Sequence, residues 1–183
     1  MVYLFLANGF EEIEALCPLD LLRRAGVEVK TVAISTGGLA VTGAHGITVM
    51  ADMAEADFDP CAEAEMLILP GGMPGAANLD ACPTVDAAIA AAVKRKSFLA
   101  AICAAPMILG RRGLLSGIEA ICFPGFEEDL KGAVLSSARV VRDGRVITAA
   151  GMGVALDFGL ALVAALLGEE VAEDLRRAVL ADR

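Results

Sequence analysis

The stretch Phe98-Leu99-Ala100-Ala101-Ile102-Cys103-Ala104-Ala105-Pro106 decides the fold of this chain. Its first five residues are all apolar, which predicts a strand buried on both faces of a parallel sheet. A helix is predicted over 104–111, so almost no loop separates the two elements. A buried strand that runs directly into a helix is typical of an α/β fold.

Short apolar runs alternate with helical patterns on both sides of this stretch. Strands are predicted over 2–7, 27–32, 66–69 and 118–122, and helices over 11–25, 84–96, 153–167 and 169–180. Glycines mark a small hairpin within 39–50, and Asp143-Gly144 predicts a tight turn between strands 138–142 and 145–148. We therefore expect one α/β domain over residues 1–183, with a mostly parallel sheet and helices on both faces.

The composition supports a buried core and excludes several classes of protein. Hydrophobic residues make up 57% of the chain and charged residues 21%, which excludes a disordered chain. A net charge of −9 disfavours binding to nucleic acid or to anionic membranes. Aromatic residues are only 4%, without Trp, and give no stacking platform for single strands. No apolar run reaches the length of a transmembrane helix.

The N-terminus and the cysteines favour a cytoplasmic protein. Residues 1–7 lack a cationic start and are interpreted as a first strand and not as a signal peptide. The five cysteines show no CxxC spacing, and with one histidine in the chain they offer zinc little to bind. We expect a reduced cytoplasmic protein without a metal site.

Cys103 carries the most chemistry in the sequence. It lies between strand and helix, with the small residues Ala101 and Ala105 two positions away on either side, as in a nucleophile elbow. We expect a strained backbone at Cys103, with the amides and the positive end of the following helix lowering the pKa of its thiol. The alternative is a small apolar cysteine buried at a strand end.

Two further strand ends meet the same edge of the predicted sheet. Glu14 follows the first strand, near Glu11 and Glu12, although acidic residues also favour any helix N-terminus. Gly71-Gly72 follows strand 66–69 and either brings a backbone amide against a ligand or forms a plain turn. The absence of a Walker phosphate loop, and of GxGxxG after the first strand, disfavours nucleotide binding.

Four segments together resemble the DJ-1/PfpI superfamily, most closely its DJ-1 branch, also called the ThiJ or YajL group. They are Asn8-Gly9-Phe10-Glu11-Glu12-Ile13-Glu14, Leu69-Pro70-Gly71-Gly72, Asn78-Leu79 and Ala100-Ala101-Ile102-Cys103-Ala104-Ala105-Pro106. The resemblance spans nearly the whole chain. It implies a flavodoxin-like three-layer sandwich, a homodimer and no cofactor.

The resemblance also implies roles for individual residues. Cys103 matches the family's reactive cysteine, and Glu14 matches the carboxylic acid that hydrogen-bonds its sulfur. Gly72 and Ala104 match positions whose backbone N–H groups face the site. Arg24 complements the dipole at the end of the first helix, and the resemblance suggests that this end faces the partner subunit or a bound anion.

The chain departs from those relatives that use a histidine as a base. Protease-like relatives place it directly after the cysteine, where this chain has Ala104, and several DJ-1 relatives place it before a proline, where this chain has Phe123. The one histidine, His45, lies in the hairpin segment and is expected at the rim of the site. Because no imidazole base is evident, peptidase activity is disfavoured.

The resemblance implies a protein of oxidative or carbonyl stress. We expect a protonated Glu14, with a raised pKa, to donate a hydrogen bond to a Cys103 thiolate. That pair permits a cofactor-independent glyoxalase or protein deglycase that acts on 2-oxoaldehydes such as methylglyoxal, or on glycated groups. Two alternatives stay open: a non-catalytic redox sensor or chaperone switched by Cys103 oxidation, and a Cys-dependent hydrolase or amidotransferase-like enzyme.

Overall fold

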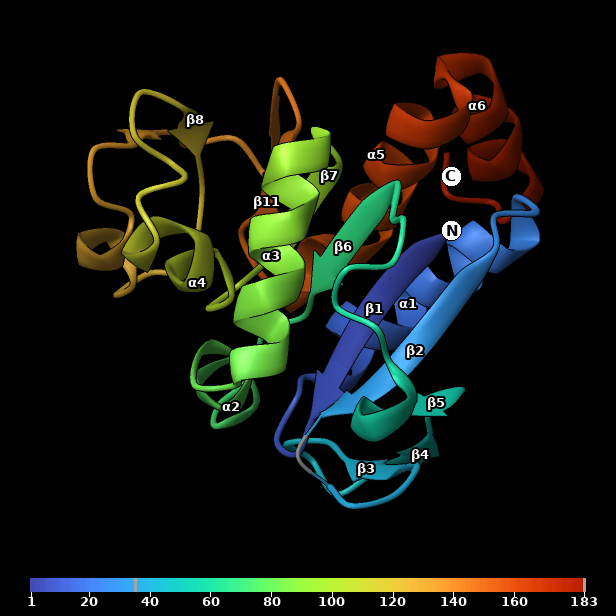
Figure 1. Ribbon diagram of the computed structural model, residues 1–183. Coiled ribbons are helices and arrows are strands. Elements are labelled where there is room, and N and C mark those ends of the chain that lie inside the picture. Colours follow the sequence, from blue (N-terminus) through green and yellow to red (C-terminus); the bar gives the residue numbers. More distant parts are fainter. Residues whose placement is uncertain (35, 183) are drawn as a thin grey trace.

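A seven-stranded sheet runs through the centre of the molecule (Figure 1). The computed structural model describes residues 1–34 and 36–182, so Ser35 and Arg183, the last residue of the predicted domain, lie outside the described residues. Neighbouring strands are parallel except for one antiparallel pair at an edge, which confirms the predicted mostly parallel sheet. The strand order is β10 (Val140–Asp143), β11 (Val146–Ala149), β7 (Phe98–Ile102), β6 (Met66–Leu69), β1 (Val2–Ala7), β2 (Val29–Ile34) and β5 (Met53–Ala54).

Helices cover both faces of the sheet and complete the predicted three-layer sandwich. One face carries α1 (Glu12–Arg24), α5 (Ala155–Leu167) and α6 (Glu169–Ala178), and the other carries α2 (Gly75–Asp80), α3 (Pro83–Arg95) and α4 (Pro106–Arg111). Within residues 1–34 and 36–182, none of the helices combines the length and the apolar character that crossing a bilayer requires.

The central strand β1 is buried on both faces because its side chains alternate between two cores. Leu4 lies in the core beneath α1 and α5, which also contains Leu22 and Phe158. Phe5 lies in the opposite core beneath α3, which also contains Ile89. A strand covered on both faces needs apolar residues at every position, which explains the continuous apolar run from Val2 to Ala7.

Two small sheets lie beside the central one. β3 (Ala40–Thr42) and β4 (Thr48–Met50) pair antiparallel, which confirms the hairpin predicted within 39–50. β8 (Glu119–Ala120) pairs with β9 (Val134–Leu135), so the strand predicted over 118–122 is shorter than expected and lies outside the central sheet. Three short 3₁₀ helices are η1 (Glu55–Asp57), η2 (Glu127–Asp129) and η3 (Met152–Val154).

The hairpin of β10 and β11 confirms the predicted tight turn with a shift of one residue. Asp143 pairs with Val146, so Gly144 and Arg145 form the turn, and Gly144 takes a φ of +56° that favours glycine. β11 runs parallel to β7, with Val146 opposite Leu99. The turn therefore lies at the end of the strands where β7 begins.

The helix after Cys103 begins later than predicted. The sequence predicts a helix over 104–111, whereas α4 begins at Pro106 and has six residues. Cys103 has a φ of +65°, from which a right-handed helix does not start, and Pro106 suits the first helical turn because it lacks an N–H.

Gly159 allows α5 to pack closely against α1. A Cβ at Gly159 would lie 2.6 Å from Leu21 Cδ1 and 2.9 Å from Pro18 Cα. Gly159→Ala should lower the free energy of unfolding by about 1–2 kcal/mol, because overpacking outweighs the gain in helix propensity. Urea unfolding measures this, with Gly153→Ala, where nothing lies within 4 Å, as the control. Equal stability of Gly159→Ala and the wild type would contradict the close approach of the two helices.

Candidate active site

Cys103 lies at the end of β7 with its backbone held on both sides. Its N–H donates to the carbonyl of Ala149 at 2.9 Å, and its own carbonyl accepts the N–H of Phe123 at 2.8 Å. The φ of +65° confirms the predicted unfavourable conformation, which a residue with a Cβ adopts only when its surroundings enforce it. The side chain is half-buried, so the sulfur is not sealed in the core.

The loop after β6 approaches Cys103 through a glycine that has no room for a side chain. A Cβ at Gly71 would lie 2.5 Å from Glu14 Oε2 and 2.6 Å from Cys103 Cβ. Gly71 therefore lets the carboxyl from α1 and the cysteine from β7 both occupy the space that a side chain would fill. The next residue, Gly72, has a φ of +83°, and its N–H faces the sulfur.

The three acidic residues at the start of α1 serve three different purposes. Glu11 caps the helix by accepting the N–H of Glu14 at 2.7 Å. Glu12 accepts the N–H of His45 at 2.8 Å and contacts its ring. Glu14 turns into the site, where it is 1% exposed and its Oε2 accepts the N–H of Gly71 at 3.0 Å. The sequence pattern alone did not separate these roles.

Glu14 has one carboxyl oxygen without an ordinary partner. Among the described residues, Oε1 is buried and has no partner that meets hydrogen-bond geometry. The Cys103 thiol nevertheless lies close enough for each group to alter the pKa of the other. An unpaired buried carboxylate oxygen is costly, and a proton on the Glu14 carboxyl would lower that cost.

Burial raises the pKa of Glu14 to about 7, and the charge of Glu11 adds to the effect. Hydrogen bonds from Cys103 and from the N–H groups of Gly71 and Met152 act in the opposite direction. The direction confirms the prediction of a raised pKa for this carboxyl. At neutral pH Glu14 is therefore near the midpoint of its titration, where a general acid or base is most useful.

The prediction of a lowered pKa for the Cys103 thiol is wrong as long as Glu14 is ionised. Burial raises the pKa of Cys103 to about 12, together with the charge and the hydrogen bond of Glu14, while the N–H groups of Gly72 and Ala104 oppose the rise. The helix after Cys103 lowers the pKa of the thiol less than predicted, because α4 begins only at Pro106 and is short.

Two of the three causes that raise the pKa of Cys103 depend on an ionised Glu14, and neither applies when Glu14 holds the proton. The carboxylate charge then disappears, and the carboxyl donates to the sulfur instead of accepting from it. The pair therefore loses one proton near pH 7 and retains a second that the two groups share. A thiolate at Cys103, as one arrangement of that shared proton, stays a prediction.

His45 is engaged with Glu12 and not with Cys103. Its Nδ1 lies 2.9 Å from Glu12 Oε2, and its side chain is 71% exposed. The hydrogen bond to Glu12 raises the pKa of His45, and the hydrogen bonds from His45 lower the pKa of Glu12 despite its burial. Ligand atoms of Glu11, Glu12 and His45 lie within 4.8 Å of one another, but N–H donors already occupy both carboxylates.

Arg24 lies far along α1 from Glu14, at the opposite end of the helix. Its Nε contacts Asp20 Oδ2 at 2.5 Å, one turn earlier on the exposed face. A contact with a partner subunit or an anion stays a prediction for this residue. Of the other cysteines, Cys61 is exposed, and Cys82 is buried with its Sγ 3.2 Å from Glu55 Oε1.

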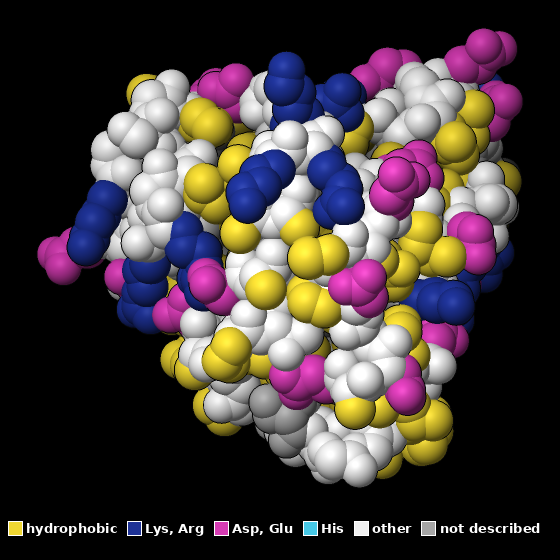
Figure 2. Space-filling model, in the orientation of Figure 1, with side chains coloured by type: hydrophobic (Ala, Val, Ile, Leu, Met, Phe, Trp, Pro, Cys, Tyr) yellow, Lys and Arg dark blue, Asp and Glu magenta, His cyan; other side chains and the backbone are white. Residues whose placement is uncertain are grey.

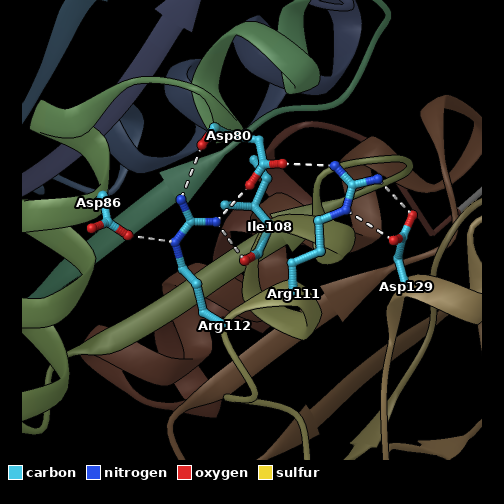
Figure 3. Close-up of polar contacts among 6 residues, drawn as sticks. All are labelled: Asp80, Asp86, Ile108, Arg111, Arg112 and Asp129. Atoms are coloured by element: carbon cyan, nitrogen blue, oxygen red, sulfur yellow. Dashed lines mark hydrogen bonds and ion pairs between the residues drawn. The ribbon is translucent and has the colours of Figure 1, made fainter.

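Two arginines tie together the helices that follow the site loops (Figure 3). Asp80, the last residue of α2, receives Arg111 at 2.7 Å and Arg112 at 2.6 Å. Arg112 also donates to Asp86 of α3, and Arg111 to Asp129 of η2. Since α2 follows the glycine loop and α4 follows Cys103, these ion pairs fix the spacing of the two loops.

The structure adds site contacts that the sequence did not indicate. The N–H of Met152 reaches Glu14, and Gly151 leaves space beside the sulfur, since a Cβ there would lie 4.0 Å from Cys103 Sγ. The same Cβ would lie 3.2 Å from Phe123, which places that ring beside the site. No motif marks residues 151–152, because their position comes from the end of β11 and not from local sequence.

Comparisons with known proteins find similar sequences and similar folds. A model of the DJ-1/PfpI family matches residues 1–165. The Parkinson disease protein 7 homolog of Danio rerio is 36% identical over 174 residues, which cover 93% of this chain and 92% of the relative. A deglycase of Thermococcus kodakarensis is 34% identical over 155 residues, which cover 80% of this chain and 87% of the relative. The structure of oxidized Toxoplasma gondii DJ-1 has a TM-score of 0.93 at 30% identity and covers 98% of this chain and 97% of that one.

The shared proton predicts how the reactivity of Cys103 depends on pH. The rate of alkylation by iodoacetamide should rise with an inflection near pH 7, where Glu14 and Cys103 together lose their first proton. In Glu14→Gln the thiol must ionise alone, and its inflection should move to the ordinary range of about 8.5 or above. Mass spectrometry of the peptide that contains Cys103 measures this rate without interference from the exposed Cys61.

Glu12→Gln is the matched control for this experiment. Glu12 is a buried carboxylate in the same helical turn, 2% exposed, and it contacts His45 in place of the sulfur. The inflection near pH 7 should survive in this variant. An unchanged inflection in Glu14→Gln would contradict the shared proton.

Proposed function

The chain belongs to the DJ-1/PfpI family, and from this membership we propose that it is a carbonyl- and oxidative-stress protein whose Cys103 attacks 2-oxoaldehydes such as methylglyoxal, or glycated groups. One observation carries the proposal. A buried carboxyl with a pKa of about 7, that of Glu14, lies close enough to the half-buried Cys103 for each group to alter the pKa of the other. An acid of this kind can give a proton to a substrate oxygen and then take one from a neighbouring carbon at neutral pH.

The relatives support the same chemistry. The Thermococcus kodakarensis relative is named a deglycase and shares 34% identity over 80% of this chain. A deglycase removes carbonyl adducts, so it acts on the same reactive group as a glyoxalase. The homodimer implied by the family resemblance, and the cytoplasmic location inferred from the N-terminus and the cysteines, stay predictions.

In the proposed first step, the sulfur of Cys103 adds to the aldehyde carbon of methylglyoxal. A carbon–sulfur bond forms, the aldehyde oxygen takes the proton that Glu14 holds, and the product is a hemithioacetal beside a Glu14 carboxylate. The N–H groups of Gly72 and Ala104, which hydrogen-bond the sulfur, supply donors for the oxygen as its charge develops.

In the proposed second step, Glu14 moves a proton between the two carbons of the adduct. Its carboxylate removes the hydrogen of the former aldehyde carbon, and the hydroxyl proton of the hemithioacetal passes to the ketone oxygen, which gives an enediol. Glu14 then returns its proton to the former ketone carbon, so that this carbon carries a hydroxyl and a thioester carbonyl remains on Cys103. Water then cleaves the thioester, which releases lactate and restores the thiol. The sum is methylglyoxal plus water giving lactate and a proton, with oxidation and reduction confined to the substrate.

The surroundings of Cys103 argue against a peptidase. Ala104 and Phe123 occupy the positions where relatives place a histidine, and the one histidine, His45, is bound to Glu12. Amide hydrolysis needs a base for water and an acid for the leaving amine, and Glu14 would have to act as both. With a 2-oxoaldehyde Glu14 also acts as acid and base in turn, but no amine has to be protonated as it leaves, since the only leaving group is the Cys103 sulfur.

A redox role for the same cysteine is the second candidate. Cys103 is half-buried and therefore open to peroxide, and the Toxoplasma gondii relative has been solved in an oxidized form. Peroxide would convert the thiolate to sulfenate and then sulfinate, and a protonated Glu14 would donate a hydrogen bond to the sulfinate oxygen. In this candidate the shared proton stabilises an oxidised product and not a carbon adduct.

Lactate formation from methylglyoxal tests the proposed function. Wild type should form lactate, Cys103→Ser should form none, and Glu14→Gln should be slower by about 100-fold or more, as for loss of a general acid–base. Cys61→Ser, which removes an exposed cysteine elsewhere, should keep full activity. Lactate formation that persists in Cys103→Ser would overturn the proposal, and its absence from a wild type that still alkylates at Cys103 would favour the redox candidate.

A further inference from the structure

A group of cations lies at the end of the strands opposite to the end where Cys103 lies. Figure 2 shows Lys and Arg side chains gathered at the top of the view, over the upper end of α3. Strand β7 begins at this end of the strands and stops before Cys103, so about 16 Å of strand separates the two places. We define the cationic site as Arg95, Lys96 and Arg145, which line one cavity at this end of the strands, together with Arg142, which shares the Phe98 ring with Arg145.

The arginines of the cationic site lack carboxylate partners, although acidic residues outnumber basic ones by 24 to 15. Arg95, Arg142 and Arg145 form no ion pair within residues 1–34 and 36–182. Seven other arginines in those ranges each pair with a carboxylate: Arg23, Arg24, Arg111, Arg112, Arg139, Arg176 and Arg177. Like charges that form no ion pairs repel one another, and a bound anion would relieve that repulsion.

Lys96 occupies a backbone position that favours glycine. It ends α3 with a φ of +59°, and its N–H caps the helix by donating to Ala92 and Val93. Glycine is the common residue at this left-handed position, since a side chain there costs roughly 1 kcal/mol. The chain therefore places a cation here at the expense of local stability, which favours a role for its charge.

Phe98 holds two of the guanidinium groups in place. The ring lies 4.5 Å from the guanidinium carbon of Arg145 and 5.3 Å from that of Arg142. Cation–π contact orders both side chains before any ligand arrives. Ordered guanidinium groups lose less entropy on binding, so the contact prepares them for an anion.

A cavity of about 650 Å³ adjoins these cations. Arg95, Lys96 and Arg145 line it, together with Glu63, Glu65 and the N-terminal Met1. The ammonium group of Met1 neutralises Glu65 at 2.6 Å, which leaves an excess of positive charge around the cavity. The volume falls within the range of pockets that bind small molecules.

We propose that the cationic site binds a small ligand that carries an oligophosphate group, such as pyrophosphate or a nucleoside triphosphate. Guanidinium groups match phosphate oxygens in pairs, and cations from both α3 and the β10–β11 turn need several linked anionic groups to engage them together. A large polyanion is disfavoured because the rest of the protein is acidic, with a net charge of −9. The chain has no phosphate-binding loop, so side chains and not backbone amides hold the ligand.

Isothermal titration calorimetry with pyrophosphate and with ATP tests this proposal. Wild type should bind saturably, and affinity should fall as salt rises. Lys96→Gly is the sharpest variant, because it removes the charge while giving the left-handed position its favoured residue; it should raise the Tm and weaken binding by about tenfold or more. Arg95→Ala should weaken binding similarly.

Two controls separate this site from general electrostatics and from Cys103. Lys131→Ala removes an exposed cation outside the cationic site and should leave the affinity unchanged. Cys103→Ser should also bind normally, because Cys103 and the cationic site lie at opposite ends of the strands. The proposal is overturned if wild type shows no saturable binding, if Lys131→Ala weakens binding as much as Lys96→Gly, or if orthophosphate binds as tightly as pyrophosphate.

Discussion

The chemistry proposed for this protein depends on one buried carboxyl, that of Glu14, which lies beside the Cys103 sulfur and is predicted to share a single proton with it. Each neighbour contributes to that placement. Glu11 caps the helix that carries Glu14, Gly71 leaves no atom in the way, and the turn at Cys103 directs the sulfur toward the carboxyl. The shared proton makes each group useful to the other, because the acid is active near neutral pH only while buried and the sulfur is nucleophilic only when the acid holds the proton.

This arrangement lowers the stability of the fold. Folding raises the pKa of Glu14 to about 7, so the folded state binds the proton more tightly than the unfolded chain does. The stabilising contribution of the protonated carboxyl is therefore fully present below the unfolded pKa and is lost as pH rises through about 7. Above that pH the buried charge costs roughly 3 kcal/mol, in addition to the strained backbone at Cys103. The two apolar cores on either side of β1 and the ion pairs of Arg111 and Arg112 hold the site together despite this cost.

Sequence patterns predicted the layers of the fold, because buried parallel strands need continuous apolar runs such as 2–7 and 98–102. They also predicted the strained turn at Cys103 from its small neighbours. They did not predict the pKa of its thiol, which depends on how deeply the sulfur is buried and on how few amides face it. Nor did they indicate Met152 or the cationic site, since both arise where segments far apart in the chain meet.

The most direct test of the central claim is a carbon-13 NMR titration of the side-chain carboxyl of Glu14, identified by the loss of its signal in Glu14→Gln. The account predicts that this signal titrates near pH 7, and that the Cys103 resonances shift over the same pH range because the proton is shared. A Glu14 signal that titrates near the ordinary value of about 4.3, with Cys103 unaffected, would contradict it.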